Sequence, residues 1–327
     1  MDTIDIKIKL SKELGAEERE ALRKSRRWIH KVNKGRYDTE LMMVVSLPKY
    51  FHPTNSYLIT KEVEVKEVLV AVKKAITNIP DIKVKIEKAT VIRVDYPFTY
   101  IMREQYNFNS YRNIMYILGG ATDLVRSKNF EDTRSKEKET FYYCDNDHTR
   151  KASNKIIIYD QGKKIKDKDL TPDKQDYDLA LKDFPELERR MRIEVSLSTN
   201  IDINQLKLKK IKKEAYKFLE RHLFNDELIE NYINEKVKNL VSLMRREGKY
   251  LKRGEFIERE RPLEYTQVRS AAKYHYDVEA SKDKFLKITR EVLRIREKRE
   301  NIIILDCFKI IKDIKLSLKR ERMKPTK

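Results

Sequence analysis

The chain has few of the residues that build glycine-rich nucleotide sites, disulfide frameworks or zinc sites. Its 327 residues include only 7 glycines, and no glycine-rich loop ends in the Lys-Ser or Lys-Thr that helps to cradle phosphate. The two cysteines, Cys144 and Cys307, lie far apart, which argues against a disulfide framework and a four-ligand zinc site. The 5 histidines form no H-x-H pair and no HExxH motif. An enzyme of this composition would have to use carboxylates, tyrosines and basic groups.

Long apolar segments are also missing. The longest runs, such as residues 302–305, have the size of core strands and fall far short of the ~20 residues that span a bilayer. The first ten residues alternate polar and apolar side chains, as a strand does, and lack the apolar core of a signal peptide. We therefore expect a soluble, cytoplasmic protein with no membrane partner.

Charge is abundant and strongly biased toward the basic side. Charged residues make up 39% of the chain, and the formal net charge is +20. Such an excess creates a positive field that attracts polyanions and speeds their association, which favours nucleic acid as a partner. The alternative is that lysine simply solvates the surface of a protein from an AT-rich genome.

The pattern of apolar residues predicts an α+β fold in two domains. Residues 1–204 mix strands with helices, including a helix over 62–79 that Pro80 ends, and a strand over 90–96 that ends at Pro97. We expect a mostly antiparallel sheet that carries the active site. Residues 205–327 have helical periodicity and predict a basic helical C-terminal domain that binds DNA.

Two predicted strands carry the same Arg-x-acid pattern. Because side chains alternate along a strand, Arg93 and Asp95 share one face of the first strand, and Arg192 and Glu194 share one face of the second. If the strands are neighbours, Asp95 and Glu194 can share a divalent cation, for which oxygen ligands suit Mg²⁺ or Mn²⁺. The commoner role of such a pattern is a cross-strand ion pair.

A third strand, residues 155–159, ends in Tyr159 just before a predicted turn. At that position the phenol can meet solvent or substrate, although a tyrosine at a strand end more often only packs. A neighbouring cation would stabilise the phenolate and polarise a phosphodiester. Tyrosine, metal and arginine together therefore suit nucleophilic attack on DNA.

The ordered motifs R-V-D-Y, T-F-Y-Y, I-I-I-Y-D-Q-G-K and R-M-R-I-E-V-S-L resemble the rolling-circle replication initiators of low-GC plasmids. They are also similar to the gene II-type replication proteins of filamentous phages. The resemblance covers roughly residues 41–200 and includes Leu47-Pro48 and Pro53-Thr54-Asn55. It implies that Tyr159 is the nicking nucleophile and that Asp95 and Glu194 bind metal, with Arg93 and Arg192 beside them.

Two departures from the family pattern affect this assignment. The glycine-serine stretch of the family is here Cys144 to His148, and the lysine that follows the tyrosine motif is here Gln161. Tyr142 and Tyr143 remain alternative nucleophiles. His148 could be a further metal ligand, although a solvated loop histidine is the commoner role.

Basic clusters at the start of the C-terminal domain are the candidate DNA contacts, although each could also be a solvated helix face. They comprise Lys207, Lys209, Lys210, Lys212, Lys213, Arg245 and Arg246. Contacts of this kind to phosphates should weaken steeply with salt.

The sequence therefore predicts a replication initiator that binds an origin as single- and double-stranded DNA. It would nick one strand, forming a 5′-phosphotyrosine and a free 3′-OH. Host helicase and polymerase are further partners that this role implies, and a homodimer stays open. The alternatives are a mobilisation relaxase, a non-catalytic DNA- or RNA-binding protein, and an adaptor whose basic charge is incidental.

Overall fold

The computed structural model describes residues 1–104, 108–126, 140–145, 154–168, 174–232, 255–259 and 302–323. The chain divides into two compact units. The first unit contains Met1–Ile101, Val125–Leu219 and Arg320–Lys327, and the second contains Met102–Leu124 and Glu220–Lys319. This division differs from the sequence-based boundary at residue 204.

An eight-stranded sheet forms the first unit, with the order β2-β3-β1-β4-β8-β7-β6-β5 and antiparallel pairing throughout. Its strands are β1 Thr3–Lys9, β2 Ile29–Lys34, β3 Glu40–Ser46, β4 Thr90–Ile101, β5 Val125–Arg126, β6 Thr140–Cys144, β7 Lys155–Asp160 and β8 Arg190–Asp202. The α+β class and the antiparallel sheet predicted from the sequence are confirmed.

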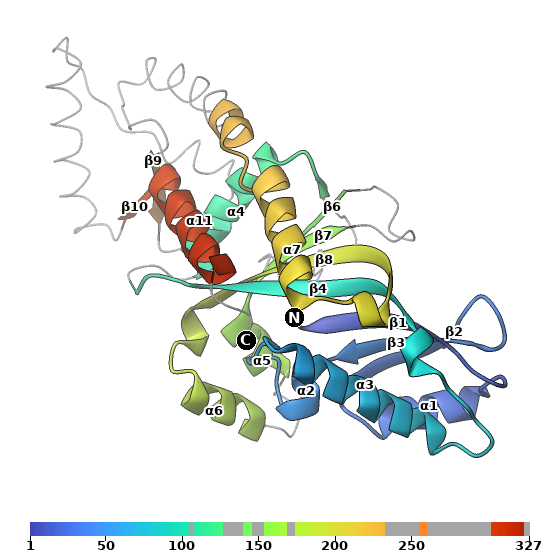
Figure 1. Cartoon of the computed structure of the whole chain (residues 1–327). Helices are drawn as coiled ribbons and strands as arrows, with labels where there is room; N and C mark the ends of the chain where they lie inside the picture. The colour runs from blue at the N-terminus through green and yellow to red at the C-terminus, as the bar shows by residue number, and fades with distance from the viewer. Residues whose placement is uncertain are drawn as a thin grey trace, which may run out of the picture. The chain divides into compact units, whose positions relative to one another are not determined.

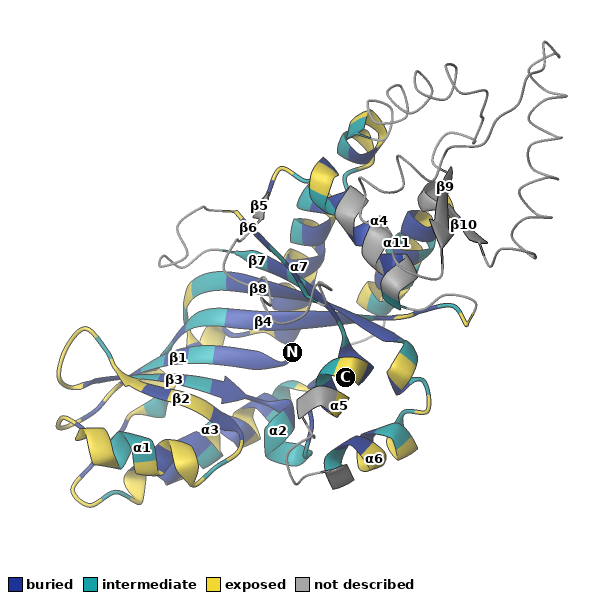
Figure 2. Cartoon of the chain, turned by 180° about the vertical axis from the view of Figure 1, so that it is seen from behind, coloured by how far each residue is buried: buried dark blue, intermediate teal, exposed yellow. Residues whose placement is uncertain are grey.

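Helices of this unit connect the strands. They are α1 Ala16–Lys24, α2 Pro48–Phe51, α3 Glu62–Thr77, α5 Gln161–Lys168, α6 Lys174–Asp183 and α7 Leu208–His222, whose last residues belong to the second unit. In Figure 1, α3 and α7 lie in front of the sheet, and from behind, in Figure 2, strands β1, β4 and β8 lie in front of them. The two helices therefore lie on one face of the sheet.

That face of the sheet is apolar because every second residue of its strands is hydrophobic. The inward set is Ile4, Ile6, Ile8, Leu41, Met43, Val45, Val94, Tyr96, Phe98, Phe141, Tyr143, Ile156, Ile158, Met191, Ile193 and Val195, all buried. The ring of Phe98 meets that of Tyr216 from α7, with centroids 6.3 Å apart. This packing explains why most of α7 belongs to the first unit.

Strand β4 runs through Pro97 to Ile101, so the predicted strand end at Pro97 is wrong. Asp95 accepts a hydrogen bond from the backbone of Asp2, so residues 95, 97 and 99 turn their backbone groups toward the β1 side. Since β1 begins only at Thr3, no strand opposite Pro97 needs its missing N–H. The N–H of Thr99 on the same side donates to Glu321 instead, at 3.0 Å.

The polar segment between β7 and β8 is helical over Gln161–Lys168 and Lys174–Asp183. Helix α5 follows β7 without a loop, and α6 follows after a short gap. Ile165, Tyr177, Ala180 and Leu187 form a small core that holds the two helices together. A single apolar residue in α5 gives little helical periodicity, so its stability comes from this tertiary packing.

In the second unit, the described elements are α4 Phe108–Ala121, the antiparallel strands β9 Glu255–Arg259 and β10 Ile302–Asp306, and α11 Cys307–Met323, which ends in the first unit. The sequence predicted helices alone in this part of the chain. The strand pair is therefore an addition to that prediction.

Replacing Gly162 in α5 by alanine should destabilise the fold. A Cβ at this position would lie 2.7 Å from the Leu187 carbonyl oxygen and 2.9 Å from the Glu188 Cα. Overpacking of this kind costs about 1–3 kcal/mol, which outweighs the ~1 kcal/mol by which alanine favours a helix. Chemical denaturation of Gly162→Ala should show this loss, whereas Gly15→Ala, whose Cβ meets only a flexible glutamate side chain at 3.4 Å, should change stability little. A stabilised Gly162→Ala would mean that α5 does not press on residues 187–188.

Candidate active site

Strand register gathers the predicted site residues on the face of the sheet opposite α3 and α7. Three successive rows cross the neighbouring strands: Thr3, Asp95, Ser196 and Lys155; then Pro97, Glu194, Ile157 and Tyr142; then Thr99, Arg192, Tyr159 and Thr140. Asp95 and Glu194 therefore lie on one face of adjacent strands, as the sequence predicted. We call this set of rows the polar face.

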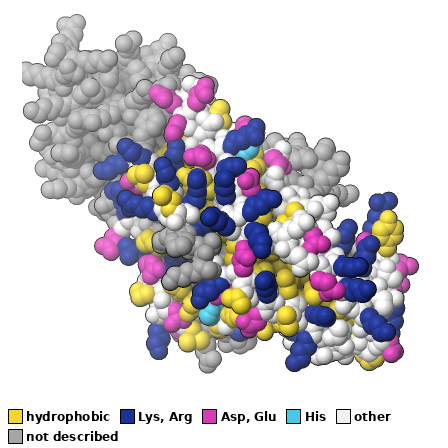
Figure 3. Space-filling view, viewed as in Figure 1, with side chains coloured by type: hydrophobic (Ala, Val, Ile, Leu, Met, Phe, Trp, Pro, Cys, Tyr) yellow, Lys and Arg dark blue, Asp and Glu magenta, His cyan; other side chains and the backbone are white. Residues whose placement is uncertain are grey.

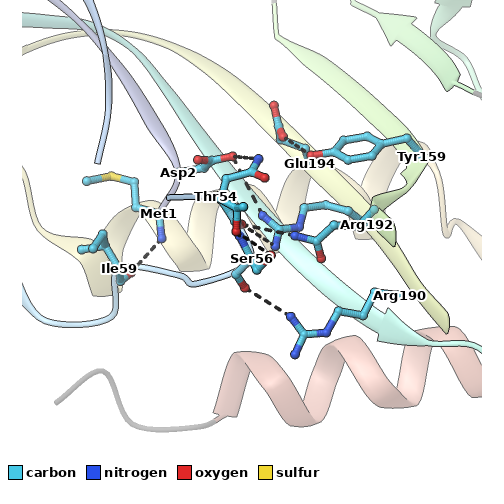
Figure 4. Close-up of polar contacts among 11 residues, drawn as sticks. Met1, Asp2, Thr54, Ser56, Ile59, Tyr159, Arg190, Arg192 and Glu194 are labelled. Atoms are coloured by element: carbon cyan, nitrogen blue, oxygen red, sulfur yellow. Dashed lines mark hydrogen bonds and ion pairs between the residues drawn. The ribbon is translucent and has the colours of Figure 1, made fainter. Parts of the chain in front are cut away.

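Tyr159 lies under other side chains and does not meet solvent. It is 1% exposed, and its hydroxyl donates to Glu194 Oε2 at 3.2 Å. Figure 4 shows the two side chains pointing toward one another. Burial, reinforced by the nearby Glu194 carboxylate, raises the pKa of the Tyr159 phenol well above its usual range. The prediction that this strand-end tyrosine is solvent-accessible is wrong, because α5 begins at once and folds back over it.

The register also separates the two alternative tyrosines. Tyr143 pairs with Ile156 on the apolar face and is 2% exposed, so it cannot reach the carboxylates. Tyr142 lies on the polar face in the row of Glu194 and is half-buried. Burial and then the Glu194 charge raise the pKa of its phenol. Tyr142 is thus the alternative nucleophile that the geometry retains.

Arg93 forms ion pairs with two carboxylates. Its Nη2 lies 3.1 Å from Asp5 Oδ1 and 3.3 Å from Asp95 Oδ2. The R-V-D pattern therefore makes the ion pair that such patterns usually make, and in addition it joins β4 to β1.

Arg192 is fully buried and is held by the loop that precedes α3. Its Nη2 donates to the Asn55 carbonyl oxygen at 3.1 Å, and its Nη1 lies 3.9 Å from Asp2 Oδ2. The same carbonyl oxygen accepts from Gln161 Nε2 at 3.2 Å, and the Asn55 side chain donates to Asp2 at 3.2 Å. Figure 4 shows Arg190, Arg192 and Glu194 following one another along β8, with Thr54 and Ser56 of the loop beside them. Asn55 and Asp2 are site residues that the analysis of single strands did not find.

Lys164 is a further site residue that the sequence did not reveal. Its ammonium lies 3.6 Å from the centroid of the Tyr159 ring, and its charge opposes the rise in the Glu194 pKa. A cation over a phenol ring is attracted by the ring electrons. Helix α5 begins directly after β7, so the first turns of the helix bring Lys164 back toward β7. A helix predicted at this point of the sequence would have indicated the contact.

Two carboxyl groups on the polar face hold their protons unusually tightly. Burial, with the charges of Asp2 and Asp5 adding to it against that of Arg93, raises the pKa of Asp95 to about 6. Burial, followed by the charges of Asp95 and Asp2, raises the pKa of Glu194 to about 7. The Asp95 carboxylate thus makes Glu194 harder to ionise, so this face attracts positive charge.

Several buried polar atoms on this face have no hydrogen-bond partner among the described residues. They include Asp2 Oδ1, Asp95 Oδ1, Gln161 Oε1 and Arg192 Nε. Within the described ranges, no group of three or more His, Cys, Asp or Glu side chains forms a metal site by itself. The polar face therefore offers both acceptor and donor atoms to a small charged species, and two carboxylates to a cation.

The basic segment at the start of α7 has one buried face and one face exposed to solvent. Leu208, Ile211, Ala215, Tyr216 and Leu219 form its buried stripe, and Lys212 falls within that stripe at 7% exposure. The side chain of Lys212 is therefore not on the exposed face of α7, which was expected to carry the DNA contacts. Lys209, Lys210 and Lys213 are exposed, as is Lys207, which lies 3.5 Å from Glu62. Figure 3 shows Lys and Arg side chains gathered near the middle of this view, over α7.

The remaining predicted site residues, Arg245, Arg246 and His148, lie outside the described residues. Comparison with protein-family models, curated proteins and solved structures finds no match to this chain. Among the described helices, none has the length and apolar character needed to cross a membrane.

The raised carboxyl pKa values predict a pH-dependent stability. Asp95 and Glu194 ordinarily titrate at 3.8 and 4.5 and do so at about 6 and about 7 in the fold. The folded state therefore binds more protons than the unfolded state between these limits, and its stability should fall as pH rises from about 4 to about 7. The Asp95→Asn, Glu194→Gln double variant should lose most of this fall and should melt at a higher temperature than the wild type at pH 8.

Thermal melts across this pH range without divalent cations provide the measurement. Glu67→Gln, which removes an exposed carboxylate from α3, is the matched control and should follow the wild type. Parallel melting curves for the wild type and the double variant would contradict the buried-carboxylate account.

Proposed function

We propose that this chain is a replication initiator that binds origin DNA and nicks one strand with Tyr159. The product would carry the 5′-phosphate on the tyrosine and leave a 3′-OH that a host polymerase can extend. The resemblance of the ordered motifs to rolling-circle initiators supports this choice. Within the structure, the observation that carries it is the hydrogen bond from the Tyr159 hydroxyl to Glu194. Glu194 itself lies one row from Arg192 on one side and one row from Asp95 on the other.

The proposed reaction begins with proton transfer within this contact. Tyr159 Oη attacks the phosphorus, and its proton passes to Glu194 Oε2, which already accepts the hydrogen bond at 3.2 Å. The bond from phosphorus to the 3′-oxygen breaks, and that oxygen takes a proton from water. Without a bound cation, a carboxyl pKa of about 7 suits a general base near neutral pH.

The negative charge on the phosphate requires donors beside the phenol. Arg192 presents Nε without a partner among the described residues, and it lies directly opposite Tyr159 in the strand register. Lys164 adds a second positive charge over the Tyr159 ring. Because Lys164 and α5 cover the tyrosine, a phosphate can reach it only if α5 or the Lys164 side chain moves aside.

The carboxylates fit a divalent cation of the Mg²⁺ or Mn²⁺ kind. Asp95 and Glu194 would hold it, and their place on one face of adjacent strands supports this assignment. Two protein carboxylates suffice for Mg²⁺, which commonly keeps several waters and binds substrate phosphates. A bound cation would polarise the phosphodiester and favour the ionised phenol. A carboxylate has two oxygens, so Glu194 can keep its bond to Tyr159 while serving this role.

The Tyr159→Phe substitution is the decisive test of the nucleophile. It removes one hydroxyl and little volume, so the fold and the DNA affinity should persist while covalent attachment to DNA disappears. The measurement is incubation with a labelled single-stranded origin oligonucleotide and Mn²⁺, followed by a denaturing gel that separates a protein–DNA adduct. Where the origin is not known, a library of strands from the flanking replicon replaces the single oligonucleotide.

Tyr142→Phe is the matched control, because it changes the other tyrosine of the polar face. An adduct that persists in Tyr159→Phe and is lost in Tyr142→Phe would transfer the role to Tyr142. Tight DNA binding by the wild type without any nicking would favour the non-catalytic alternative.

The exposed lysines of α7 should contribute the salt-dependent part of DNA binding. Replacing Lys209, Lys210 and Lys213 by glutamine removes up to three phosphate contacts, so the slope of log affinity against log salt should flatten by about 0.7–0.9 per lost contact. Titrations at several salt concentrations provide the measurement. Lys212→Met changes a buried lysine of the same helix and should leave the slope unchanged, provided that the variant folds. Equal slopes for the triple variant and the wild type would make these lysines a solvated face.

A further inference from the structure

A row of aromatic rings extends from α2 to the end of α6. Its members, which we call the aromatic row, are Trp28, Tyr50, Phe51, His52, Tyr57 and Phe184. Successive ring centroids lie 5.5, 4.9, 6.4, 3.5 and 4.8 Å apart. His52 and Tyr57 stack nearly parallel, with 13° between their planes. The segments that supply these rings are far apart in the sequence.

The row is not an ordinary core cluster. Trp28 is buried, whereas the other five residues of the row are only half-buried. Tyr57 meets Phe184 edge to face, with 71° between the ring planes, and the Arg190 guanidinium lies 3.9 Å from the centroid of the Phe184 ring. Burial, together with the charge of Arg27, lowers the pKa of His52 against the opposing charges of Asp183 and Glu64, so its ring is neutral at pH 7. Neutral rings with cations beside them are the surface on which nucleobases stack.

The aromatic row is connected to the candidate active site through residues 53–57. Tyr57 belongs to the row, and two residues earlier the Asn55 carbonyl oxygen accepts from Arg192 at 3.1 Å. Arg190 donates to the Ser56 carbonyl oxygen at 3.2 Å while its guanidinium lies over Phe184. The loop at residues 53–57 therefore connects the aromatic row to the candidate active site through its hydrogen bonds with Arg190 and Arg192.

We infer that the aromatic row is a stacking platform for the unpaired bases of a single DNA strand, which it would hold beside the polar face. This inference rests on the proposed nicking function, for which it names the binding surface of the cleaved strand. Duplex DNA hides the faces of its bases, so the row would discriminate in favour of unpaired strands. The negative charges of Asp183 and Glu64 disfavour phosphates beside them, so the DNA backbone would run on the side of the exposed Arg27.

The test measures binding of the full-length protein to fluorescent oligodeoxythymidine of about 12 nucleotides, within the site sizes of stacking modules. Divalent cations are chelated, so that no cleavage interferes. Tyr57→Leu should weaken binding about tenfold, since it removes one aromatic ring on which a base can stack. The slope of log affinity against log salt should not change, because no phosphate contact is removed.

Two variants serve as controls. Tyr57→Phe keeps the ring and loses only the hydroxyl that donates to Asp183, so it should bind like the wild type. Tyr37→Leu removes another tyrosine, 59% exposed with Arg36 stacked 5.7 Å from its centroid, that lies outside the row. It should also leave the affinity unchanged. Circular dichroism and thermal melts report whether each variant folds.

A second measurement needs no variant. The wild type is photocrosslinked to the same strand carrying 5-iodouracil, and the attached peptides are mapped. We expect attachment at residues 50–57 and at Phe184. Attachment only elsewhere, an unchanged affinity in Tyr57→Leu, or tighter binding of oligouridine than of oligodeoxythymidine would overturn the inference. If the strand binds to the aromatic row but no nicking occurs, the proposed reaction is wrong and the stacking platform stands. If nicking occurs and Tyr57→Leu keeps the affinity of the wild type, the platform is wrong and the proposed reaction stands.

Discussion

The pairing of β8 between β4 and β7 is the constraint on which the candidate site depends. From Arg190 to Leu197 every residue of β8 is buried, with apolar side chains on one face and Arg192, Glu194 and Ser196 on the other. A slip of one residue would bring Glu194 into the apolar core and Ile193 onto the polar face. The apolar packing of Ile193 and Val195 against β4 and β7 therefore fixes the register that sets Glu194 beside Tyr159 and one row from Asp95.

Burying this much charge has a cost that the described contacts offset only in part. Arg93 balances Asp5 and Asp95, and Arg192 approaches Asp2, yet the pKa values of Asp95 and Glu194 remain raised. A network with only a structural role would be expected to satisfy its buried oxygens, since each unpaired one is destabilising. Asp2 Oδ1 and Asp95 Oδ1 have no hydrogen-bond partner among the described residues. The polar face therefore keeps negative charge that its two arginines balance only in part.

Alternation along single strands was enough to predict which residues share the polar face. It placed Arg93 with Asp95 and Arg192 with Glu194, and the apolar residues between them predicted the sheet itself. What it could not provide were contacts made by tertiary packing. Lys164 reaches Tyr159 only because the small core around Ile165 holds α5 in place. With one apolar residue in α5, the sequence of this helix does not predict that packing. Pro97 is tolerated in β4 because β1 begins at Thr3, a fact of strand length that no local pattern contains.

Lys212 illustrates a prediction that the sequence could have corrected. Its position four residues after Leu208 and next to Ile211 places it on the apolar stripe of α7, although its neighbours Lys209, Lys210 and Lys213 lie on the outer face. Helical periodicity assigns each lysine of such a run to the buried or the exposed face of the helix, so the run as a whole does not form one basic patch. The surface that α7 offers to phosphate is therefore narrower than the run suggests.

The loop at residues 53–57 gives the proposed chemistry and the proposed strand binding a common support. The Asn55 carbonyl oxygen accepts from both Gln161 of α5 and Arg192 of β8, and Ser56 accepts from Arg190. Any displacement of this loop must lengthen bonds to the helix that covers Tyr159 and to the arginine opposite that tyrosine. A strand that stacks on Tyr57 would act on the same loop, and so would bear on the position of α5 and on access to the phenol. Binding and access would then be linked by hydrogen bonds between three elements, with no need for a large rearrangement of the sheet.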